Sequence, residues 1–291
     1  MSASVCLLSF DIEDWFQTEN LRPAFPVETW EDLEPRVEAN TRRILDILAR
    51  RGVPATFFVL GWVAERSPAL VREIAAAGHE VASHGYGHVM PTRLGLDEFR
   101  ADLRRARGVL EEFGGPVRGY RAPNYAIDDE RLGVVFEEGH VYDSSHHPVD
   151  HHDRYGRLTR FAGEVKPGVL RVEGGGYEFV LPVARLGPVR LPASGGGWFR
   201  LYPGSMSRVL ARRIVAEWGH TVLYLHPWEF DPGQPRAGAA VSRVNRWRHY
   251  NNLGRTAARL DGLIGAFRAD GVRFARMGEY LVEVTGETRC P

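Results

Sequence analysis

Short apolar runs recur along the chain, and runs of this length are typical of buried β-strands. The predicted strands cover residues 5–11, 55–60, 80–83, 117–120, 140–143, 221–225 and 272–275. Amphipathic segments between them predict helices over residues 38–50, 68–77, 129–137, 206–218 and a long segment reaching Phe267. The clearest predicted helix has one apolar face, formed at spacings of four and three by Phe99, Leu103, Ala106, Leu110 and Phe113.

Strands that alternate with helices predict a parallel sheet in an α/β fold. The length of 291 residues suits an α/β barrel, and no Gly-rich dinucleotide fingerprint follows the first strand. We therefore expect a closed or nearly closed barrel as a single domain over residues 1–291. The alternation breaks after Ser145, so residues 146–200 are expected to be a β-rich elaboration of one connection, and residues 200–285 to complete the barrel.

The composition is that of a globular chain without a strong charge bias. Lys+Arg and Asp+Glu number 37 each, which gives no reason to expect a nucleic acid or an acidic membrane surface as partner. The two cysteines imply no disulfide framework. The N-terminus lacks a basic n-region and no apolar run approaches a membrane span, so we expect a cytoplasmic protein without a transmembrane segment. Peripheral contact with the inner membrane face stays open.

Unusual polar residues gather at the C-terminal ends of the predicted strands. "DIED" begins at Asp11, "SHGYGH" contains His84 and His88, "YRAPNY" contains Arg121, "YDSSHH" contains Asp143, and "LYLHPWE" contains His226. In a parallel barrel these strand ends converge on one face, where active sites are built. We therefore expect residues that are far apart in the sequence to meet there.

His84 and His88 are the best candidates for metal ligands. The two glycines between them favour a turn that can fold both imidazoles onto one point. Neutral imidazole with a carboxylate suits Zn²⁺, and also Fe²⁺, Co²⁺ or Ni²⁺. One divalent metal would supply the positive charge that the acids after the first strand require, binding one acid and leaving another free. The alternative is a polar surface loop that happens to carry two histidines.

The motifs "SFDIED", "HGYGH", "RAPNY", "YDSS" and "LYLHPWE", in this order, resemble the five motifs of polysaccharide deacetylases with the NodB homology domain. The second half, with "GGGWFRLYP" and "RHYNNLGRT", resembles the subgroup that accompanies exopolysaccharide gene clusters of the exosortase type. The resemblance implies a distorted barrel of seven or eight β/α units. It also implies metal-dependent hydrolysis of N-acetyl groups on the N-acetylhexosamine residues of a polysaccharide or oligosaccharide, with release of acetate.

The resemblance assigns roles to several residues. Asp11 matches the general base, and Arg121 matches the arginine that pairs with this base and orients it. His226 matches the general acid that protonates the leaving amine. We expect Asp143 to hydrogen-bond near His226 and to set its tautomer, although the second acid and the tryptophan that often follow this aspartate in the family are missing here.

The third metal ligand is open between two carboxylates. The family commonly has adjacent aspartates, whereas Ile12 follows Asp11 in this chain. Glu13 would lie on the same face as Asp11 if the strand continues. Asp14 is slightly favoured, because a short carboxylate in a turn would leave Asp11 free of the metal.

The substrate side of the site is expected in the "RAPNY" turn and among aromatic residues. A backbone N–H in the turn formed by Pro123, Asn124 and Tyr125 would stabilise the oxyanion. About half of the aromatic residues in these loops are expected to belong to the core. The preferred candidates for contact with sugar rings are Trp15, Trp198 and Trp228.

Some alternatives remain from the sequence. "HHPVDHHD", which carries His146, His147, His151 and His152, could be a second metal site, but a solvated loop, a substrate rim or an accidental patch is favoured over it. The same scaffold could also hydrolyse the C–N bond of a small amide or a cyclic ureide. A third hypothesis is a glycan-binding protein without catalytic activity.

Overall fold

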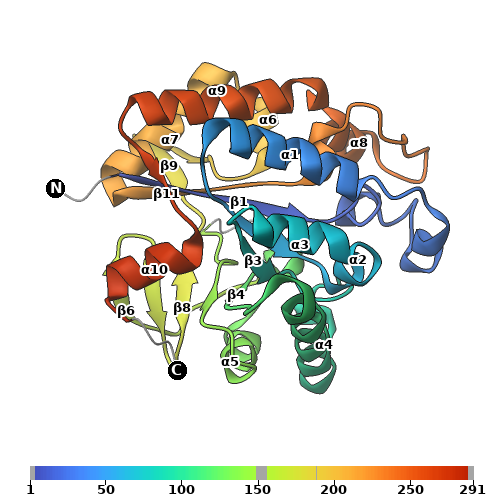
Figure 1. The fold of residues 1–291 in the computed structure, drawn as a ribbon, viewed down its shortest axis with the longest axis horizontal. Coiled ribbons are helices and arrows are strands. Elements are labelled where there is room, and N and C mark those ends of the chain that lie inside the picture. Colours follow the sequence, from blue (N-terminus) through green and yellow to red (C-terminus); the bar gives the residue numbers. More distant parts are fainter. Residues whose placement is uncertain (1–3, 149–155, 188, 288–291) are drawn as a thin grey trace.

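One mostly parallel β-sheet runs through the centre of the molecule, as the computed structural model of the chain shows (Figure 1). The structure describes residues 4–148, 156–187 and 189–287. The strands of the main sheet are β1 (Val5–Ile12), β2 (Thr56–Val59), β3 (Glu80–Ser83), β4 (Gly119–Tyr120), β5 (Tyr142–Asp143), β6 (Phe161–Lys166), β7 (Val169–Val172), β8 (Tyr177–Phe179), β11 (His220–Leu225) and β12 (Arg273–Phe274).

The strand order is β11-β1-β2-β3-β4-β5-β8-β7-β6, with β12 paired beside β1. All neighbours from β11 to β8 are parallel, and only β7 and β6 add antiparallel pairs at one end. This is the expected α/β architecture of a distorted barrel. The β-rich segment extends the main sheet through β6, β7 and β8, and it adds a separate hairpin of β9 (Val183–Leu186) and β10 (Val189–Pro192).

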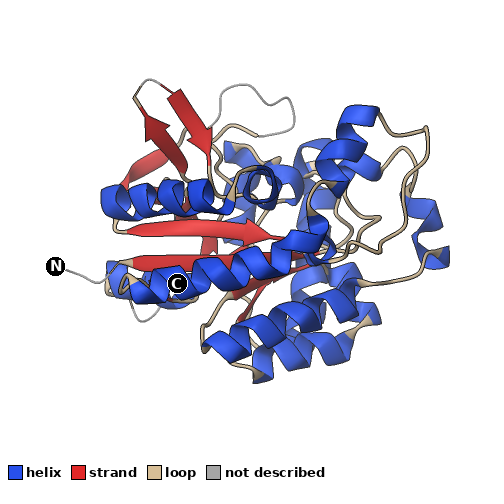
Figure 2. Cartoon of the chain, turned by 90° about the horizontal axis from the view of Figure 1, so that it is seen from above, coloured by secondary structure: helices blue, strands red, loops and turns tan. Residues whose placement is uncertain are grey.

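Helices lie on either side of the central strands (Figure 2). They are α1 (Val37–Arg51), α2 (Gly61–Arg66), α3 (Pro68–Ala76), α4 (Leu96–Gly114), α5 (Asp129–Glu137), α6 (Gly196–Leu201), α7 (Gly204–Trp218), α8 (Arg243–Tyr250), α9 (Thr256–Ala269) and α10 (Met277–Thr285). The apolar face predicted for α4 is buried at Phe99, Leu103, Ala106 and Leu110.

The long helix predicted to carry Ala257, Leu260, Ile264 and Phe267 is α9, and Leu253 lies in the short helical turn before it. The sequence did not predict α8, which ends before Asn251 and is separated from α9 by Asn252, whose φ of 55° is left-handed. The predicted last strand is followed by α10, which packs Tyr280 and Leu281 into the core. Within the described residues, no helix combines the length and the apolar surface needed to cross a bilayer.

The alternation of side chains in β1 places Asp11 inside the barrel. Every residue of β1 is buried. Leu8 and Phe10 pack in the core cluster that includes residues of α1 and α9, whereas Leu7 packs in a second cluster on the other face. Because alternate residues of a strand share a face, Ser9 and Asp11 point with Leu7 to the interior.

Candidate functional site

The fully buried Arg121 is held by the interior face of β1. Its Nη1 donates to Oδ1 of Asp11 at 2.6 Å and to Oγ of Ser9 at 2.9 Å. Its Nε and Nη2 donate to the carbonyl oxygen and to Oγ of Ser144, each at 3.0 Å. Burial disfavours the guanidinium charge, but Asp11 outweighs this effect, so the pKa of Arg121 is raised. Arg121 therefore fixes one oxygen of Asp11 and compensates its charge within the protein interior.

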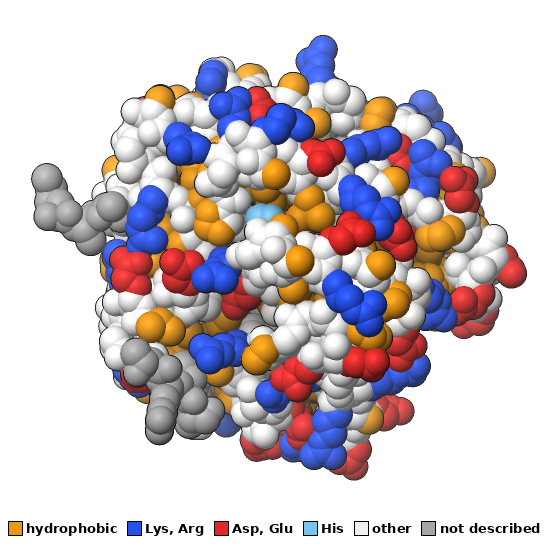
Figure 3. All heavy atoms as spheres, viewed as in Figure 1, with side chains coloured by type: hydrophobic (Ala, Val, Ile, Leu, Met, Phe, Trp, Pro, Cys, Tyr) orange, Lys and Arg blue, Asp and Glu red, His pale blue; other side chains and the backbone are white. Residues whose placement is uncertain are grey.

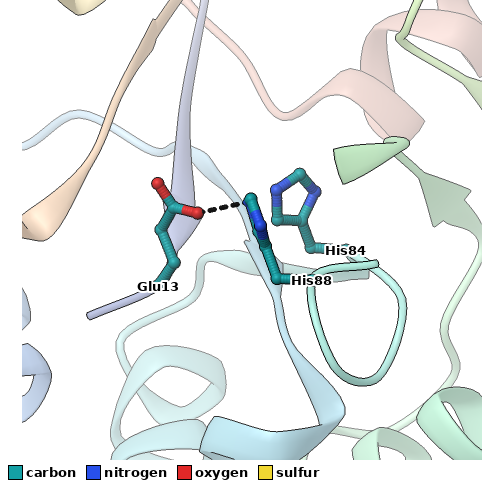
Figure 4. A group of neighbouring side chains, drawn as sticks. All are labelled: Glu13, His84 and His88. Carbon is teal, nitrogen blue, oxygen red and sulfur yellow. Dashed lines mark ion pairs between the residues drawn. The ribbon is translucent and has the colours of Figure 1, made fainter. Parts of the chain in front are cut away.

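Glu13, His84 and His88 converge on one point beside this pair (Figure 4). One possible ligand atom from each residue lies within 4.8 Å of the others, and all three residues are buried. Oε2 of Glu13 is 2.5 Å from Nε2 of His88. Nδ1 of His84 donates to the carbonyl oxygen of Arg121 at 2.8 Å, which leaves Nε2 of His84 as the atom available to a metal.

The ionisation of these groups also fits a metal site. Burial lowers the pKa of His84 to about 4, so its imidazole is neutral near pH 7, as a metal ligand must be. Burial alone would raise the pKa of Glu13, but the imidazoles of His88, His226 and His84 hold it below its usual range. Two imidazoles and one carboxylate form a donor set that suits a divalent cation.

The turn that carries both histidines depends on backbone conformations that few residues adopt. Gly85 has a φ of 74°, and a Cβ there would lie 3.0 Å from Oδ2 of Asp102. This same oxygen accepts the N–H of Tyr86 at 2.9 Å, so α4 supports the turn from below. His88 itself has a φ of 53°, a left-handed conformation that is uncommon for a residue with a Cβ.

Asp14, the slightly favoured ligand, lies elsewhere, and the structure corrects this preference. Its Oδ2 accepts the N–H groups of Arg36 at 2.8 Å and of Val37 at 3.1 Å, at the first turn of α1. Its Oδ1 accepts the N–H of Trp15 at 2.8 Å. The chain turns directly after β1, so the shorter side chain faces the start of α1 while the longer Glu13 reaches the histidines.

His226 faces Asp11 across the site and is held from behind by Glu229. Nε2 of His226 is 3.8 Å from Oδ2 of Asp11 and 3.7 Å from Oε1 of Glu13. Oε2 of Glu229 lies 3.1 Å from Nδ1 of His226 and accepts its backbone N–H at 2.9 Å. Burial lowers the pKa of His226, but the hydrogen bond to Glu229 and the charges of Glu13 and Asp11 outweigh it and raise the pKa to about 9.

The expected partner of His226, Asp143, is engaged with its own strand end. Its two oxygens accept the hydroxyl of Ser145 at 2.8 Å and the N–H of Ser145 at 3.1 Å. The structure therefore corrects the expected contact between Asp143 and His226. Glu229 was missed although it is the last residue of the motif "LYLHPWE", because the resemblance assigned a role only to His226 there. Its position three residues after His226 is the spacing of a capping pair.

Arg200 anchors Glu229 and was also missed. Its Nε donates to Oε1 of Glu229 at 2.7 Å, and both side chains are buried. The backbone carries Glu229 so close to α6 that a Cβ at Gly196 would lie 1.8 Å from Oε2 of Glu229. The three glycines before Trp198 were the only sequence signal of this close approach.

Trp228 is buried beside Glu13 and does not form an open platform for a sugar. Its ring stacks on His226 at 5.2 Å and on His249 at 4.1 Å, and its Nε1 donates to Oε1 of Glu13 at 3.0 Å. Trp15 is also corrected as a sugar contact, since it is 2% exposed and packs among aromatic rings. Trp198 is 40% exposed, so it keeps the accessibility that a sugar contact requires.

The "RAPNY" turn lies beside Asp11, as expected. The hydroxyl of Tyr125 is 3.4 Å from Oδ2 of Asp11. The N–H of Tyr125 donates to the carbonyl of Ala122 at 2.9 Å, and Pro123 has no N–H. Among the three residues of the turn, this leaves the backbone N–H of Asn124 as the candidate donor to an oxyanion. The φ of Asn124 is 56°.

The proposed second metal site is only partly described. His151 and His152 lie outside the described residues. His147 is buried, and its ring centroid is 6.3 Å from that of Tyr125. On the face shown in Figure 3, basic and acidic side chains are interspersed, with both signs close together.

Two family models match the chain in succession. Residues 25–142 match "Polysaccharide deacetylase", and residues 144–282 match "Domain of unknown function (DUF3473)". The chitooligosaccharide deacetylase of Sinorhizobium fredii is 52% identical over 101 residues, which cover 34% of this chain and 47% of the relative. The chain spans less than half the length of the first curated relatives that it matches.

Solved structures share the fold at low sequence identity. A candidate polysaccharide deacetylase from Mycobacterium smegmatis has a TM-score of 0.64 and 24% identity, and the match covers 100% of this chain and 93% of that protein. A CE4 family pseudoenzyme from Bacillus anthracis has a TM-score of 0.51 and 17% identity, with 96% and 68% covered. The distorted β/α barrel expected from the motifs is confirmed by these neighbours and by the parallel sheet. The family match over residues 25–142 agrees with the motifs, so this segment of the chain is similar to polysaccharide deacetylases.

Proposed function

We propose that this protein is a metal-dependent hydrolase that removes N-acetyl groups from the N-acetylhexosamine residues of a polysaccharide or oligosaccharide and releases acetate. One observation carries the proposal. The trio of Glu13, His84 and His88 lies beside two further groups. One is Asp11, a carboxylate held by a buried arginine, and the other is His226, an imidazole held by a buried carboxylate. The named activities of the relatives support the same reaction.

Glu13, His84 and His88 would hold one divalent metal. When bound, such a metal supplies Lewis-acid activation of water and of the acetyl carbonyl. Zn²⁺ suits this donor set best, with Co²⁺, Ni²⁺ or Fe²⁺ as alternatives. The hydrogen bond from His84 Nδ1 to the carbonyl of Arg121 orients one ligand, and the hydrogen bond from Trp228 Nε1 to Oε1 orients Glu13.

Asp11 acts as the general base. Arg121 occupies its Oδ1, so Oδ2 faces the site and accepts a proton from the attacking water. Arg121 has no direct part in the bond changes, because its other N–H groups are taken by Ser9 and Ser144. The backbone N–H of Asn124 donates to the oxyanion as the carbonyl carbon of the acetyl group becomes tetrahedral.

His226 acts as the general acid. Glu229 accepts Nδ1–H, which leaves Nε2–H directed toward Asp11 and Glu13, where the leaving amine receives the proton. The order of events therefore moves one proton from water to Asp11 and another from His226 to nitrogen.

We further propose that residues 1–291 work as one catalytic domain. His84 and Arg121 come from the segment that matches the deacetylase family, whereas His226 and Glu229 come from the segment of unknown function. The first segment thus supplies a proposed metal ligand and the arginine that holds the base Asp11, and the second supplies the proposed acid and its carboxylate partner. The described residues show no break in the sheet between them, since β5 pairs with β4 on one side and with β8 on the other.

A glycan-binding protein without activity is the main competitor, because one neighbour with this fold is a pseudoenzyme. The presence of base, acid, arginine and ligand trio in one place favours catalysis. A hydrolase of small amides is a second competitor, and the exposed Trp198 favours a sugar over it.

Acetate release from N-acetylchitooligosaccharides tests the proposal. We expect release by the metal-loaded protein, its loss after chelation, and its return when Zn²⁺ or Co²⁺ is added. Asp11→Asn and His226→Ala should keep the fold by circular dichroism and lose turnover. Full activity in both variants would refute the assigned roles, and turnover of a panel of small amides without glycan turnover would favour the second competitor.

A further inference from the structure

A pocket lined by arginines is formed partly by α8. Figure 1 shows this helix beyond the C-terminal end of β1. Its volume is about 300 Å³, and its walls are formed by Arg236, Ala237, Arg243, Arg246 and Tyr250. We call it the arginine pocket. Arg243 and Arg246 are three residues apart in α8 and so share one helix face, with Tyr250 one turn further.

The positive charge of this pocket is not neutralised by the protein. Residues 232–260 contain six arginines and no acidic residue, although the whole chain has a formal net charge of zero. Among the described residues, neither a salt bridge nor a side-chain hydrogen bond satisfies Arg236, Arg243 or Arg246. Other surface arginines of the chain do have carboxylate partners, such as Arg42 with Glu73.

The walls of the arginine pocket are fixed by hydrogen bonds. The hydroxyl of Tyr250 accepts the N–H of Ala237 at 2.7 Å and donates to the carbonyl of Pro235 at 3.2 Å. The guanidinium of Arg236 lies 4.3 Å from the centroid of the Tyr250 ring. The Tyr250 wall of the pocket and the guanidinium of Arg236 are therefore held in place, which lowers the entropy cost of binding there.

A series of ring contacts connects the arginine pocket with the proposed acid. Tyr250 packs edge-on against His249 at 4.7 Å, His249 stacks on Trp228 at 4.1 Å, and Trp228 stacks on His226 at 5.2 Å. Arg200, which anchors Glu229, also donates to the carbonyls of Arg248, His249 and Asn251, so the same residue fixes the end of α8. Three successive ring contacts therefore separate Tyr250, at the wall of the arginine pocket, from His226.

We propose that the arginine pocket binds a negatively charged group of the glycan, a carboxylate or a phosphate, while an acetamide of the same molecule is hydrolysed beside His226. This inference rests on the proposed function and deepens it, because it makes the substrate an anionic glycan. Guanidinium groups match the two oxygens of a carboxylate or phosphate, and such charge-assisted pairs are stronger than neutral hydrogen bonds. Among the described residues, no carboxylate forms a salt bridge with the three arginines of the pocket.

The test compares two glycans that share N-acetylglucosamine and differ in charge. Hyaluronan oligosaccharides carry a carboxylate on every second sugar, and N-acetylchitooligosaccharides of equal length are neutral. Binding to the metal-loaded Asp11→Asn protein is measured by calorimetry. We expect the anionic glycan to bind at least tenfold more tightly, as one charge-assisted pair provides, and the preference to shrink as salt is raised.

The variants are Arg243→Gln and Arg243→Gln/Arg246→Gln in the Asp11→Asn protein, with thermal unfolding as a check of the fold. Arg118→Gln is the matched control, because Arg118 is an exposed arginine before β4. The preference for the anionic glycan should fall to about one in the pocket double variant and stay in the control. Equal affinity for both glycans in the parent protein, or a preference that the pocket variants do not change, would overturn the inference.

Two further measurements, vesicle binding and acetate release, distinguish this inference from lipid binding and from the proposed reaction itself. Val244 and Trp247 are exposed on α8, so vesicles of anionic and of zwitterionic phospholipid are included. Arginine-dependent binding to anionic vesicles without preference for the anionic glycan would overturn the glycan assignment. Acetate release by the protein with intact Asp11 is measured in parallel. Release without anionic preference refutes only this inference, whereas arginine-dependent preference without release refutes only the proposed reaction.

Discussion

Nε of Arg200 lies 2.7 Å from Oε1 of Glu229, and the other oxygen of this carboxylate lies 3.1 Å from Nδ1 of His226. A buried arginine, a buried carboxylate and an imidazole thus form one row that ends at the proposed active site. Partners of this kind fix the tautomer and the orientation of the ring that they contact. Glu229 is therefore a positioning residue for His226, and Arg200 is a positioning residue for Glu229.

Glu229→Gln should lower kcat by about 10–100-fold and change KM little. The glutamine side chain is a neutral acceptor for Nδ1–H of His226, whereas the carboxylate that it replaces is charged. The ¹⁵N shifts of His226 should report a lower pKa of its imidazole, because the hydrogen bond and the charge of Glu229 that raise this pKa are weakened or removed. Glu229→Asp should recover part of the activity. If kcat and the amount of folded protein fell equally and the ¹⁵N shifts did not change, Glu229 would have only a structural role and would not position His226.

Glu13→Gln and Asp14→Asn should separate metal binding from stability. Glu13→Gln should lose the metal measured by elemental analysis, because one ligand oxygen is replaced by an amide. Asp14→Asn should keep the metal and lower the free energy of unfolding by about 1 kcal/mol, since Asp14 accepts the first N–H groups of α1. Retention of one metal per chain in Glu13→Gln, with loss in Asp14→Asn, would reverse the assignment of the ligand.

Gly196→Ala should impair both folding and turnover, because its Cβ would occupy the place of Oε2 of Glu229. Overpacking of this kind costs about 1–3 kcal/mol in the free energy of unfolding. Gly197→Ala is the matched control, since a Cβ at Gly197 meets no atom within 4 Å. Urea denaturation and acetate release should distinguish the two variants, and equal behaviour of both would contradict the close approach of α6 to Glu229.

The stability of the protein should fall as the pH drops from 7 to 5, partly because of His140. Burial, assisted by the charge of Arg107, lowers the pKa of His140 to about 3, below the ordinary value of about 6.5 in the unfolded chain. Between these two values the unfolded state binds the proton and the native state does not, so stability decreases as the pH falls. At pH 5 the loss attributable to His140 is about 2 kcal/mol.

His140→Gln checks this prediction, because it removes the titrating group whatever it does to stability at pH 7. The difference in unfolding free energy between pH 7 and pH 5, from urea denaturation, should be smaller in the variant by about the same 2 kcal/mol. Parallel pH curves for the two proteins would show that His140 is already accessible to protons in the native state.

The sequence predicted the features that follow from periodicity and from strand ends. Asp11, Arg121, His84, His88 and His226 meet because parallel strands place their C-terminal ends at one face. The hydrophobic pattern also identified β1 and α4 with small errors at their ends.

The choice between carboxylates could not be made from the pattern. Glu13 and Asp14 are neighbours, and their roles are decided by how the chain turns after Ile12 and by where α1 begins. These are tertiary contacts over more than twenty residues, which local periodicity does not encode.

The partner of His226 was missed for a related reason. Family motifs drew attention to Asp143, which ends its own strand, whereas Glu229 lies in the short helical turn after His226. Arg200 acts through a contact with Glu229 that is distant in sequence, and the segment "GGGWFRLYP" that contains Arg200 suggested no role for it. Burial of an arginine together with a glutamate is visible only when the side chains are placed.

The boundary between the two family matches falls at residues 142–144, within or directly after β5. This strand pairs in register with β4 before the boundary and with β8 after it. A recombination event at this boundary would therefore pair strands that come from two different parent proteins. It would also combine the base of one parent with the acid of the other. The two segments should accordingly be inherited as a unit and change together, so that a gene encoding only one of them would specify an incomplete sheet.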